Sequence, residues 1–482
     1  MSLYDDHPLT ALDTKAHTLL GEKSVIKSLA SQASLQRLPR FVSEYMIAKF
    51  VKAETWKADL ENISTKIRDL MPEQDQKEQI IDRLASTGQI KVIDFLDANL
   101  DLKTNKRSVS VPCIGQSNVR CPAEITKETP GIYDGMWGTA TIKYSPESDA
   151  KAPCELTAFT PFQVGKIDLD EFTGFRKHFS TDEWMSVILQ SAGYAAAAFP
   201  DRRTKLLLLT RMIPLVERNI NMIELGPRQT GKTFLLRNLS GKVFTISGGK
   251  TTPANLFLNL STKNVGILGT RKVVVFDEVA HADFAQADET ISTLKDYMES
   301  GNYSRGSQNF NVDAGLVFGG NIDVDGNKPA AKYRHLLEPL PMKLQDSAFH
   351  DRMHAYLPGW EIPKITNASI ATGVGFLTDY YGEVLVRMRD ISMADKLSRV
   401  PLAGGMTRRD LRAVERTTSG YMKLLYPDGN ATDDEMLEIV TLACELRQRV
   451  HNQLCVLAAG EFKARMIAPA SVKEYTAPDM QK

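Results

Sequence analysis

The chain has 482 residues, with 59 Lys and Arg set against 59 Asp and Glu, and 43% of its residues are apolar. At about 100 to 200 residues per domain, this length predicts roughly two to four domains, each with its own core. The composition excludes collagen-like, intrinsically disordered and disulfide-scaffold proteins. Because the formal net charge is zero, any surface that binds nucleic acid must be local and balanced by acidic residues elsewhere.

The sequence shows no membrane or export signal. Residues 1–8 are acidic rather than basic, and the apolar stretches are interrupted well short of a spanning helix. We therefore expect a cytoplasmic protein with no membrane partner. The five cysteines include no C-x-x-C pair. A loose metal site at Cys113, Cys121 and Cys154 is the alternative to reduced core thiols, and we predict thiols and no zinc.

The periodicity of apolar residues divides the first part of the chain into three segments. Residues 1–100 show mainly helical spacing and predict an N-terminal helical domain. Short alternating runs begin near residue 90, and we assign residues 101–165 to a β-rich barrel or sandwich. Residues 166–202 predict a linker and then a helix that opens with a capping box from Ser180 to Glu183.

Strands and helices alternate over residues 203–365, which predicts an α/β domain. Short apolar runs at residues 222–225 and 272–276 are of the type expected for buried parallel strands. Beyond residue 366 the pattern is helical again through residue 482. The second half therefore predicts an α/β core followed by a helical domain.

The strand at residues 222–225 is followed by the pattern of a phosphate loop. In such a loop, backbone N–H groups surround the β-phosphate of a nucleotide, a lysine adds charge, and a hydroxyl binds Mg²⁺. A chance match is the alternative, but the strand before the motif and the helical pattern after it argue against chance. The predicted nucleotide-binding residues are Gly226, Pro227, Arg228, Gln229, Thr230, Gly231, Lys232 and Thr233.

Two carboxylates follow the apolar run that ends at Phe276. Taken alone, an acidic pair after a strand is more often a helix N-terminal charge. Together with the phosphate loop, it predicts that Asp277 and Thr233 hold Mg²⁺ and that Glu278 polarises the water that attacks the γ-phosphate. We therefore predict an ATP hydrolase that uses ATP and Mg²⁺.

A third apolar strand at residues 316–320 ends in the amide side chain of Asn321. From a strand beside the acidic one, this amide could orient the attacking water. The alternative is an ordinary turn residue. We favour the functional reading of Asn321.

The phosphate loop, the acidic strand end and the Asn-ended strand, in this order, resemble an AAA+ ATPase, and the helical region after residue 366 is similar to its lid domain. The wider chain resembles more narrowly the Lon-like ATPase family of BREX phage-defence systems, the BrxL family. The stretches that carry this likeness are Leu38-Pro39-Arg40-Phe41-Val42, Asp182-Glu183-Trp184, Phe276-Asp277-Glu278-Val279-Ala280 and Lys295-Asp296-Tyr297-Met298-Glu299-Ser300-Gly301.

This resemblance implies two catalytic arginines. Asp351-Arg352-Met353 is similar to the segment of Lon-type ATPases that carries an arginine finger, so Arg352 would reach the γ-phosphate of a neighbouring subunit. The segment at residues 407–411 resembles the lid helix that carries the second sensor arginine. Arg409 is the closer match and Arg408 is the alternative. From composition alone, each arginine would be a solvated or helix-capping side chain.

The sequence argues against a peptidase. A Lon-type protease needs a Ser nucleophile and a Lys on a separate C-terminal module, and only residues 461–482 follow the last predicted helices. Either the chain is a short family form or it belongs to a longer protein, and we expect no peptide cleavage by it. The pore-loop position of protein-unfolding AAA+ rings reads Lys263-Asn264-Val265-Gly266 here, which lacks the usual aromatic residue. A ring of lysines suits phosphates better than polypeptide.

Residues 302–312 predict a hairpin with Arg305 near its tip. This segment resembles the pre-sensor hairpin of MCM-type helicases, which projects into the channel and tracks DNA, whereas the alternative is an ordinary surface hairpin. The β-rich segment carries Lys103, Lys106 and Arg107 and fits an oligonucleotide-binding (OB) barrel like that of MCM proteins. Such a basic cluster is otherwise most often a solvated edge.

These observations predict an α/β AAA+ core with a helical lid, preceded by a helical and OB-like region. We expect a homo-hexamer that can pair into a dodecamer, encircles double-stranded DNA, and acts in phage restriction with other BREX components. Two alternatives stay open, an ATP-driven protein remodeller and a nucleotide-gated DNA-binding scaffold that does not translocate. Stimulation of ATP turnover by DNA length or by unfolded protein would separate them.

Overall fold

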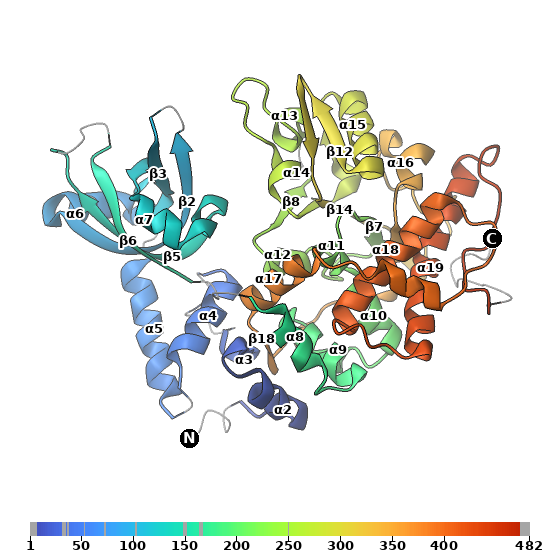
Figure 1. Ribbon diagram of the computed structural model, residues 1–482, viewed down its shortest axis with the longest axis horizontal. Helices are drawn as coiled ribbons and strands as arrows, with labels where there is room; N and C mark the ends of the chain where they lie inside the picture. Colours follow the sequence, from blue (N-terminus) through green and yellow to red (C-terminus); the bar gives the residue numbers. More distant parts are fainter. Residues whose placement is uncertain are drawn as a thin grey trace. The chain divides into compact units, whose positions relative to one another are not determined.

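The computed structural model describes residues 7–30, 35, 38–52, 54–71, 74–101, 104–147, 152–162, 167–248 and 250–472. The chain divides into two compact units, Met1–Ile167 and Asp168–Lys482 (Figure 1). This division places the barrel in the first unit and the nucleotide-binding motifs in the second.

The first unit begins with helices that bury one apolar face. In α5, Trp56, Leu60, Ile63 and Ile67 recur at helical spacing and are buried. Pro39 immediately precedes α4, and its fixed backbone geometry suits the start of a helix. The elements of this part are α2 (Ala11–Leu20), β1 (Ser24–Ile26), α3 (Lys27–Ala30), α4 (Arg40–Phe50), α5 (Trp56–Leu70) and α6 (Lys77–Thr87).

Five strands close into a barrel in the order β2-β3-β4-β6-β5. Neighbouring strands are antiparallel except β4 and β6, which are parallel. Apolar side chains alternate inward along the strands and fill the interior. The barrel consists of β2 (Gln89–Asp101), β3 (Lys106–Val111), β4 (Gln116–Arg120), β5 (Met136–Tyr144) and β6 (Cys154–Pro161), with the short helix α7 (Ala123–Glu128) between β4 and β5.

The barrel begins earlier than residue 101, where we placed its predicted boundary. Helix α6 ends at Thr87, and Gly88 follows in the left-handed conformation that favours glycine at a helix end. β2 then starts at Gln89 and pairs with β5 from Gln89 to Leu96. Cys121 and Cys154 are buried in the barrel core, where they act as small apolar side chains.

The second unit is built on a parallel sheet with the strand order β17-β7-β14-β10-β8. Both predicted apolar runs are strands of this sheet. Because β14 lies between β7 and β10, the carboxyl ends of these three strands are neighbours at one edge. The strands are β7 (Asn221–Gly226), β8 (Val243–Ser247), β10 (Val273–Asp277), β14 (Gly315–Asn321) and β17 (Ala355–Pro358).

Helices surround this sheet, with the C-terminal helices drawn in orange and red beside it (Figure 1). The predicted capping box is present at α9, where Ser180 Oγ accepts from Glu183 N at 3.2 Å and Ser180 N donates to Glu183 Oε2 at 2.9 Å. The helices are α8 (Leu169–Arg176), α9 (Thr181–Ser191), α10 (Arg202–Thr210), α11 (Ile213–Val216), α12 (Phe234–Leu239), α13 (Pro253–Leu256), α14 (Ile267–Thr270), α15 (Ala287–Ser300), α16 (Ser347–Asp351), α17 (Thr378–Met388), α18 (Arg408–Leu425) and α19 (Asp433–Leu457).

Short strands complete the second unit. Among them, β12 (Asn302–Arg305) and β13 (Gln308–Asn311) form the predicted hairpin. The others are β9 (Lys250–Thr251), β11 (Asp283–Phe284), β15 (Val324–Asp325), β16 (Lys328–Pro329) and β18 (Val374–Phe376).

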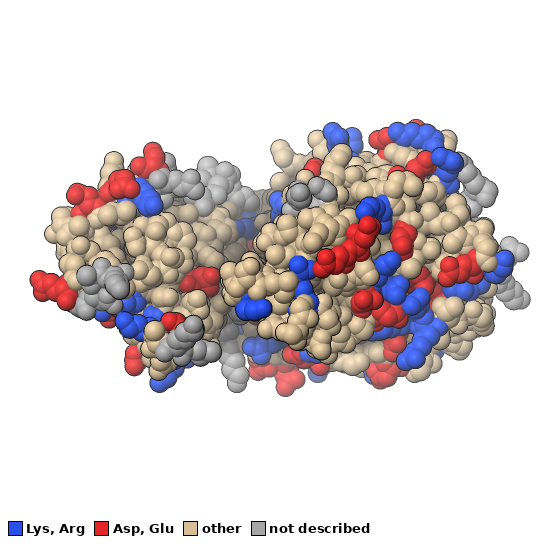
Figure 2. Space-filling view, turned by 90° about the horizontal axis from the view of Figure 1, so that it is seen from above, with Lys and Arg blue, Asp and Glu red and all other residues tan. Residues whose placement is uncertain are grey.

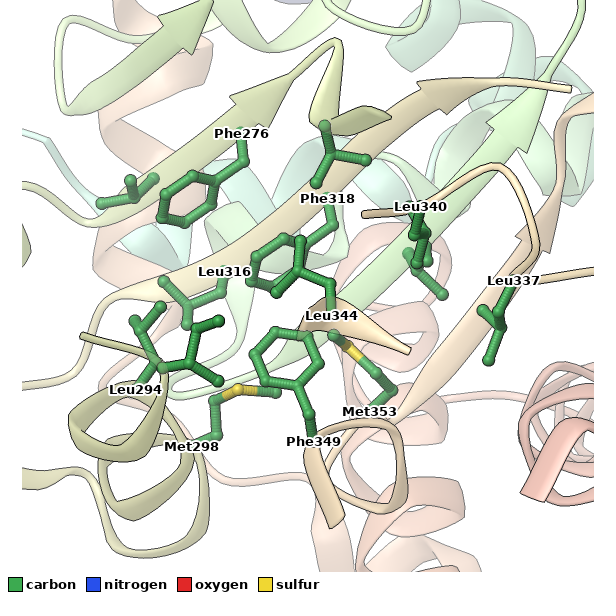
Figure 3. Packing of buried hydrophobic residues seen from close by; sticks show 14 of the residues in the cluster. Phe276, Leu294, Met298, Leu316, Phe318, Leu337, Leu340, Leu344, Phe349 and Met353 are labelled. Carbon is green, nitrogen blue, oxygen red and sulfur yellow. The ribbon is translucent and has the colours of Figure 1, made fainter. Parts of the chain in front are cut away.

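Aromatic side chains hold α15 and α16 against the sheet (Figure 3). Phe276 of β10 and Phe318 of β14 stack with their ring centroids 4.8 Å apart, and Phe349 of α16 meets Phe318 edge-on at 5.3 Å. Phe349 and Met353 are both buried in this cluster. Because they flank Arg352 in sequence, their packing fixes the backbone that carries this arginine.

The last two long helices belong to the same compact unit as the sheet. α19 packs against β17, and its Val450 and Leu454 are part of the hydrophobic cluster that includes Phe318. Arg447 of α19 is 1% exposed in its side chain and binds Asp351 and Asp410. The helical region is thus joined to the α/β core by both apolar and ionic contacts.

Two buried histidines predict that the second unit loses stability in mild acid. Burial lowers the pKa of His350 to about 4. Burial and the nearby Arg416, Arg447 and Arg412 lower the pKa of His354 well below its usual value. The unfolded chain takes up these protons near pH 6.5, so the folded state is fully stabilised above that pH and loses stability as pH falls, on the order of 2 kcal/mol for His350 at pH 5.

Thermal unfolding at pH 7.5 and pH 5 measures this effect. We expect a lower melting temperature at pH 5, and we expect the same fall in a His178→Gln variant, since His178 is exposed. A melting temperature that stays constant or rises on acidification would contradict the assignment of two neutral buried histidines.

Candidate functional site

The predicted phosphate loop lies between β7 and α12, at the carboxyl edge of the sheet. Gln229 and Gly231 have φ values of 69° and 71°, which turn the backbone through the left-handed region. A Cβ on Gly226 would lie 2.6 Å from the carbonyl carbon of Gly359, so only glycine fits where the loop leaves the strand. Arg228 and Gln229 are exposed, whereas Thr230 is buried beneath the loop.

The amino group of Lys232 lies between the loop and the end of β14. Its Nζ donates to Gly226 O at 3.1 Å, to Pro227 O at 2.8 Å and to Asn321 Oδ1 at 3.1 Å. Burial lowers the pKa of Lys232 from its ordinary value. The structure therefore brings together a loop lysine and a strand-end amide that are 89 residues apart in sequence.

The two predicted magnesium ligands also meet. Thr233 Oγ1 donates to Asp277 Oδ2 at 2.8 Å, which joins the end of the phosphate loop to the end of β10. Both groups present oxygen atoms, the ligands that Mg²⁺ prefers. The donor set at this edge therefore suits a magnesium ion.

Glu278 adopts a left-handed backbone conformation, with φ 52° and ψ 44°. This conformation is unusual for a residue with a Cβ and is concentrated at functional sites. Its backbone N donates to Asp277 Oδ1 at 3.0 Å, and the residue is exposed at the edge of the sheet. The turn thus directs Asp277 toward Thr233 and leaves Glu278 accessible to solvent.

A buried ion pair supports the loop from below, and sequence reasoning missed it. Arg211 donates to Glu224 at 2.6 Å and 3.0 Å and to Thr230 O at 2.9 Å. Tyr194 Oη donates to Gly231 O at 3.2 Å. The available signal was Glu224 itself, because a carboxylate within an apolar buried strand requires a cationic partner.

Arg352 lies at the opposite edge of the sheet. Asn221, the first residue of β7, donates from Nδ2 to Arg352 O at 3.2 Å. A strand rises roughly 3.3 Å per residue, so Asn221 and Gly226 are separated by about 17 Å. Arg352 therefore lies far from the phosphate loop of its own chain.

The first residues of α18 reach the same edge. Arg409 donates to Glu299 Oε2 at 3.0 Å and also pairs with Asp351. Glu299 lies 3.4 Å from Arg352 Nε. The alternative, Arg408, is exposed. Of the two candidate sensor arginines, the structure brings only Arg409 to the carboxylate that Arg352 contacts.

Lys263 lies in an exposed loop closed by a bridge between Leu258 and Val265. The loop contacts the β12–β13 hairpin, because Tyr303 Oη donates to Phe257 O at 3.1 Å and Arg305 Nε donates to Leu258 O at 3.1 Å. The two segments that we predicted to face DNA are therefore neighbours.

The side chain of Arg305, however, does not project from the hairpin. Its guanidinium is 14% exposed and lies 3.1 Å from Glu289. The turn after it consists of Gly306 and Ser307, with φ 61° at Gly306. In this arrangement, Arg305 joins the hairpin to the neighbouring loop, and Lys263 is the accessible cation.

The predicted basic cluster on the barrel is only partly described, because Lys103 lies outside the described residues. Lys106 is exposed and is paired in register with Asp101. Arg107 shares the parity of the inward-facing Val109 and Val111. Since successive side chains of a strand point to opposite faces, Lys106 and Arg107 do not form one patch.

Charges are mixed on the surface as well. On the face of the molecule seen in Figure 2, Lys and Arg side chains lie among Asp and Glu.

In the part of the chain that the structure describes, no group of three or more His, Cys, Asp or Glu side chains is arranged to hold a metal ion. None of the described helices is both long and apolar enough to cross a membrane.

Two family models match this chain. The model of the Lon-like protease BrxL-like ATPase domain matches residues 154–468. The model of the N-terminal region of the BREX system Lon protease-like protein BrxL matches residues 18–144. The first match contains the whole sheet and both arginine-bearing segments, and the second contains most of the barrel.

Two curated relatives are both named Lon-like protease BrxL. The protein of Escherichia coli O9:H4 (strain HS) is 35% identical over 446 residues, which cover 91% of this chain and 63% of the relative. The protein of Bacillus cereus (strain H3081.97) is 35% identical over 460 residues, which cover 94% of this chain and 68% of the relative. This chain thus spans about two thirds of the length of these relatives.

These matches confirm the family resemblance that the motifs indicated. The parallel sheet, the phosphate loop and the matched ATPase domain together make the second unit an AAA+-type α/β core. The chain belongs to the BrxL family of BREX systems.

Proposed function

We propose that this chain is the subunit of a ring-forming AAA+ ATPase that binds duplex DNA and moves along it in BREX phage defence. The observation that supports this most directly is the separation of charged groups between two edges of one sheet. Lys232, Asp277 and Glu278 lie at the carboxyl edge, and Arg352 lies at the amino edge. Since one chain cannot bring both sets to the same phosphate, neighbouring subunits would complete each other's sites.

The assembly that the family resemblance implies is a homo-hexamer that can pair into a dodecamer. Other BREX components are further partners of this assembly. Arg352 would act as the arginine finger, and Arg409, which shares Glu299 with it, would act beside it as the second sensor.

The residues at the carboxyl edge would divide the work of ATP hydrolysis. Bound Mg²⁺ neutralises charge on the β- and γ-phosphates, and Thr233 and Asp277 would hold it. Lys232 would donate from Nζ to these phosphates. Glu278 would accept a proton from the attacking water, and the Asn321 amide would orient that water.

The barrel supports the assignment of DNA as the partner. A closed five-stranded barrel with a helix between its third and fourth strands is similar to the OB barrels that bind oligonucleotides. In the second unit, the exposed Lys263 is the cation best placed to contact phosphates, and the hairpin held by Arg305 would support its loop.

Removing the Lys263 charge tests the DNA assignment. Six copies of the loop would act together in a ring, so we expect Lys263→Ala to weaken duplex binding severely. The slope of log affinity against log salt should become shallower, because fewer counterions are released. Lys263→Arg, which keeps the charge, should retain most of the affinity and the slope.

The Arg305→Ala variant tests whether Arg305 contacts DNA directly or acts only by supporting the Lys263 loop. If Arg305 acts through the loop, its loss should weaken binding while changing the salt slope less than Lys263→Ala does. Fluorescence anisotropy of labelled duplex at several salt concentrations measures both quantities. If both Lys263→Ala and Arg305→Ala leave the affinity and the salt slope unchanged, this surface does not bind DNA.

One observation favours a protein remodeller as the second candidate. Leu260 and Val265 flank Lys263 and are 44% and 42% exposed, and apolar side chains in a channel suit a polypeptide. Stimulation of ATP turnover by unfolded protein and not by duplex DNA would support this candidate. DNA binding without length-dependent turnover would instead support a scaffold.

A further inference from the structure

Three arginines from two segments converge on Glu299, near the end of α15. Arg352 Nε lies 3.4 Å from Glu299 Oε2, and Arg409 Nη2 lies 2.8 Å from the same oxygen. Arg412, one turn further along α18, donates to the backbone oxygen of Glu299 at 2.9 Å. Two guanidinium groups therefore lie beside the Glu299 carboxylate, and a third binds the backbone of the same residue.

Negative charge in this cluster is scarce. Asp351 is the other carboxylate beside Arg409, and it also receives Arg447 from α19. Arg412 donates to the backbone oxygen of Glu299 rather than to its carboxylate. Arginines that converge with too few carboxylates form a typical site for a multiply charged oxyanion.

Space for such an anion lies beside the cluster. A cavity of about 840 Å³ is lined by Glu299, Arg409 and Arg412 and continues along α18 to Arg416, with Glu217 and Glu415 also in its lining. Burial and the neighbouring Arg412 lower the pKa of Arg416 to about 10, although Glu217 and Glu415 act in the opposite direction. Because the cluster is at the amino edge of the sheet, its anion is not the nucleotide of its own chain.

We propose that Glu299 occupies the position at which Arg352, Arg409 and Arg412 bind the terminal phosphate of ATP held by a neighbouring subunit. Arg412 is then a third phosphate ligand, and Glu299 is an internal competitor that leaves when the phosphate arrives. Carboxylate and phosphate accept the same charge-assisted hydrogen bonds, and phosphate carries more charge and more acceptor oxygens. This inference rests on the proposed subunit-to-subunit site and adds two residues to it.

The preference for ATP over ADP is the measurement that tests this inference, because only ATP carries the γ-phosphate. All variants are made in assembled Glu278→Gln protein, and affinities for ATP and ADP are measured by competition with a fluorescent nucleotide. Arg412→Ala should lower the ratio of ATP to ADP affinity about tenfold, the effect of losing one charged hydrogen bond. Arg412→Lys should restore part of it.

Glu299→Gln should act in the opposite direction. Removing the competing charge while keeping the shape of the side chain should raise ATP affinity several-fold and leave ADP affinity unchanged. Arg334→Ala is the control, since Arg334 is an exposed arginine that pairs with Glu338, and it should change neither affinity.

The outcomes separate this inference from the proposal on which it rests. If Arg352→Ala leaves the ATP-to-ADP ratio unchanged, the subunit-to-subunit site itself is wrong. If Arg352→Ala lowers the ratio while Arg412→Ala does not, Arg412 is not a phosphate ligand. If Glu299→Gln weakens ATP binding or has no effect on it, Glu299 is not a competitor.

Discussion

Replacing Glu278 by Gln is expected to leave ATP binding nearly intact and to slow hydrolysis by a factor on the order of 10² or more. Binding should survive because Lys232 keeps its place between the loop and Asn321, and Thr233 stays paired with Asp277. Hydrolysis should fail because the amide cannot accept a proton from the attacking water. Glu278 is exposed in a left-handed turn, so replacing its carboxylate by an amide leaves the packing of the core unchanged.

Two further variants define the comparison. Lys232→Ala should lose nucleotide binding itself, because its ammonium group would no longer meet the phosphates. Glu461→Gln changes an exposed carboxylate beyond α19 and should retain the unaltered binding and turnover. Nucleotide titration and steady-state phosphate release measure the two properties. Hydrolysis by Glu278→Gln at the unaltered rate would show that this carboxylate is not the base.

Arg352→Ala subunits alone should bind ATP and fail to hydrolyse it, and mixing them with Lys232→Ala subunits should restore turnover. In a mixed ring, some interfaces would place an intact phosphate loop opposite an intact finger. The physical reason is the length of β7, which holds Arg352 at one edge of the sheet and the loop at the other.

The dependence of ATP turnover on the ratio of the two variant subunits is the decisive measurement. Turnover should be absent in either variant alone and should pass through a maximum at intermediate ratios. The control is a double variant that carries both Lys232→Ala and Arg352→Ala. When it is mixed with either single variant, no interface contains both an intact phosphate loop and an intact finger, so turnover should not be restored. No recovery at any ratio, in rings shown by mass spectrometry to contain both subunits, would count against a finger that acts between subunits.

Much of the carboxyl edge could be predicted from the sequence because its parts are local. The phosphate loop is one continuous segment, and Asp277, Glu278 and Asn321 each follow an apolar run directly. Once these runs are strands of a parallel sheet, their ends must share an edge. In the structure, Thr233 contacts Asp277 and Lys232 contacts Asn321 at this edge.

For the barrel, the periodicity of apolar residues predicted strands but not where the domain begins. Alternation predicted strands near residue 90, yet the domain boundary at residue 101 assigned all of β2 except Asp101 to the helical domain. The sequence does not state which strand closes the barrel, because that depends on the pairing of β2 with β5 across more than forty residues. Closure is a property of the complete set of hydrogen bonds.

The sequence by itself therefore determined the phosphate loop, the strand-end carboxylates and the membership of the BrxL family, since each depends on neighbours in the chain. Only the tertiary structure decided the surroundings of the arginines. It placed Arg352, Arg409 and Arg412 around Glu299, and it tied Arg305 to Glu289 and the neighbouring loop. The sequence specifies the charge of each side chain, but packing between distant segments determines which side chains pair with one another. This pairing determines which charged groups can bind a ligand.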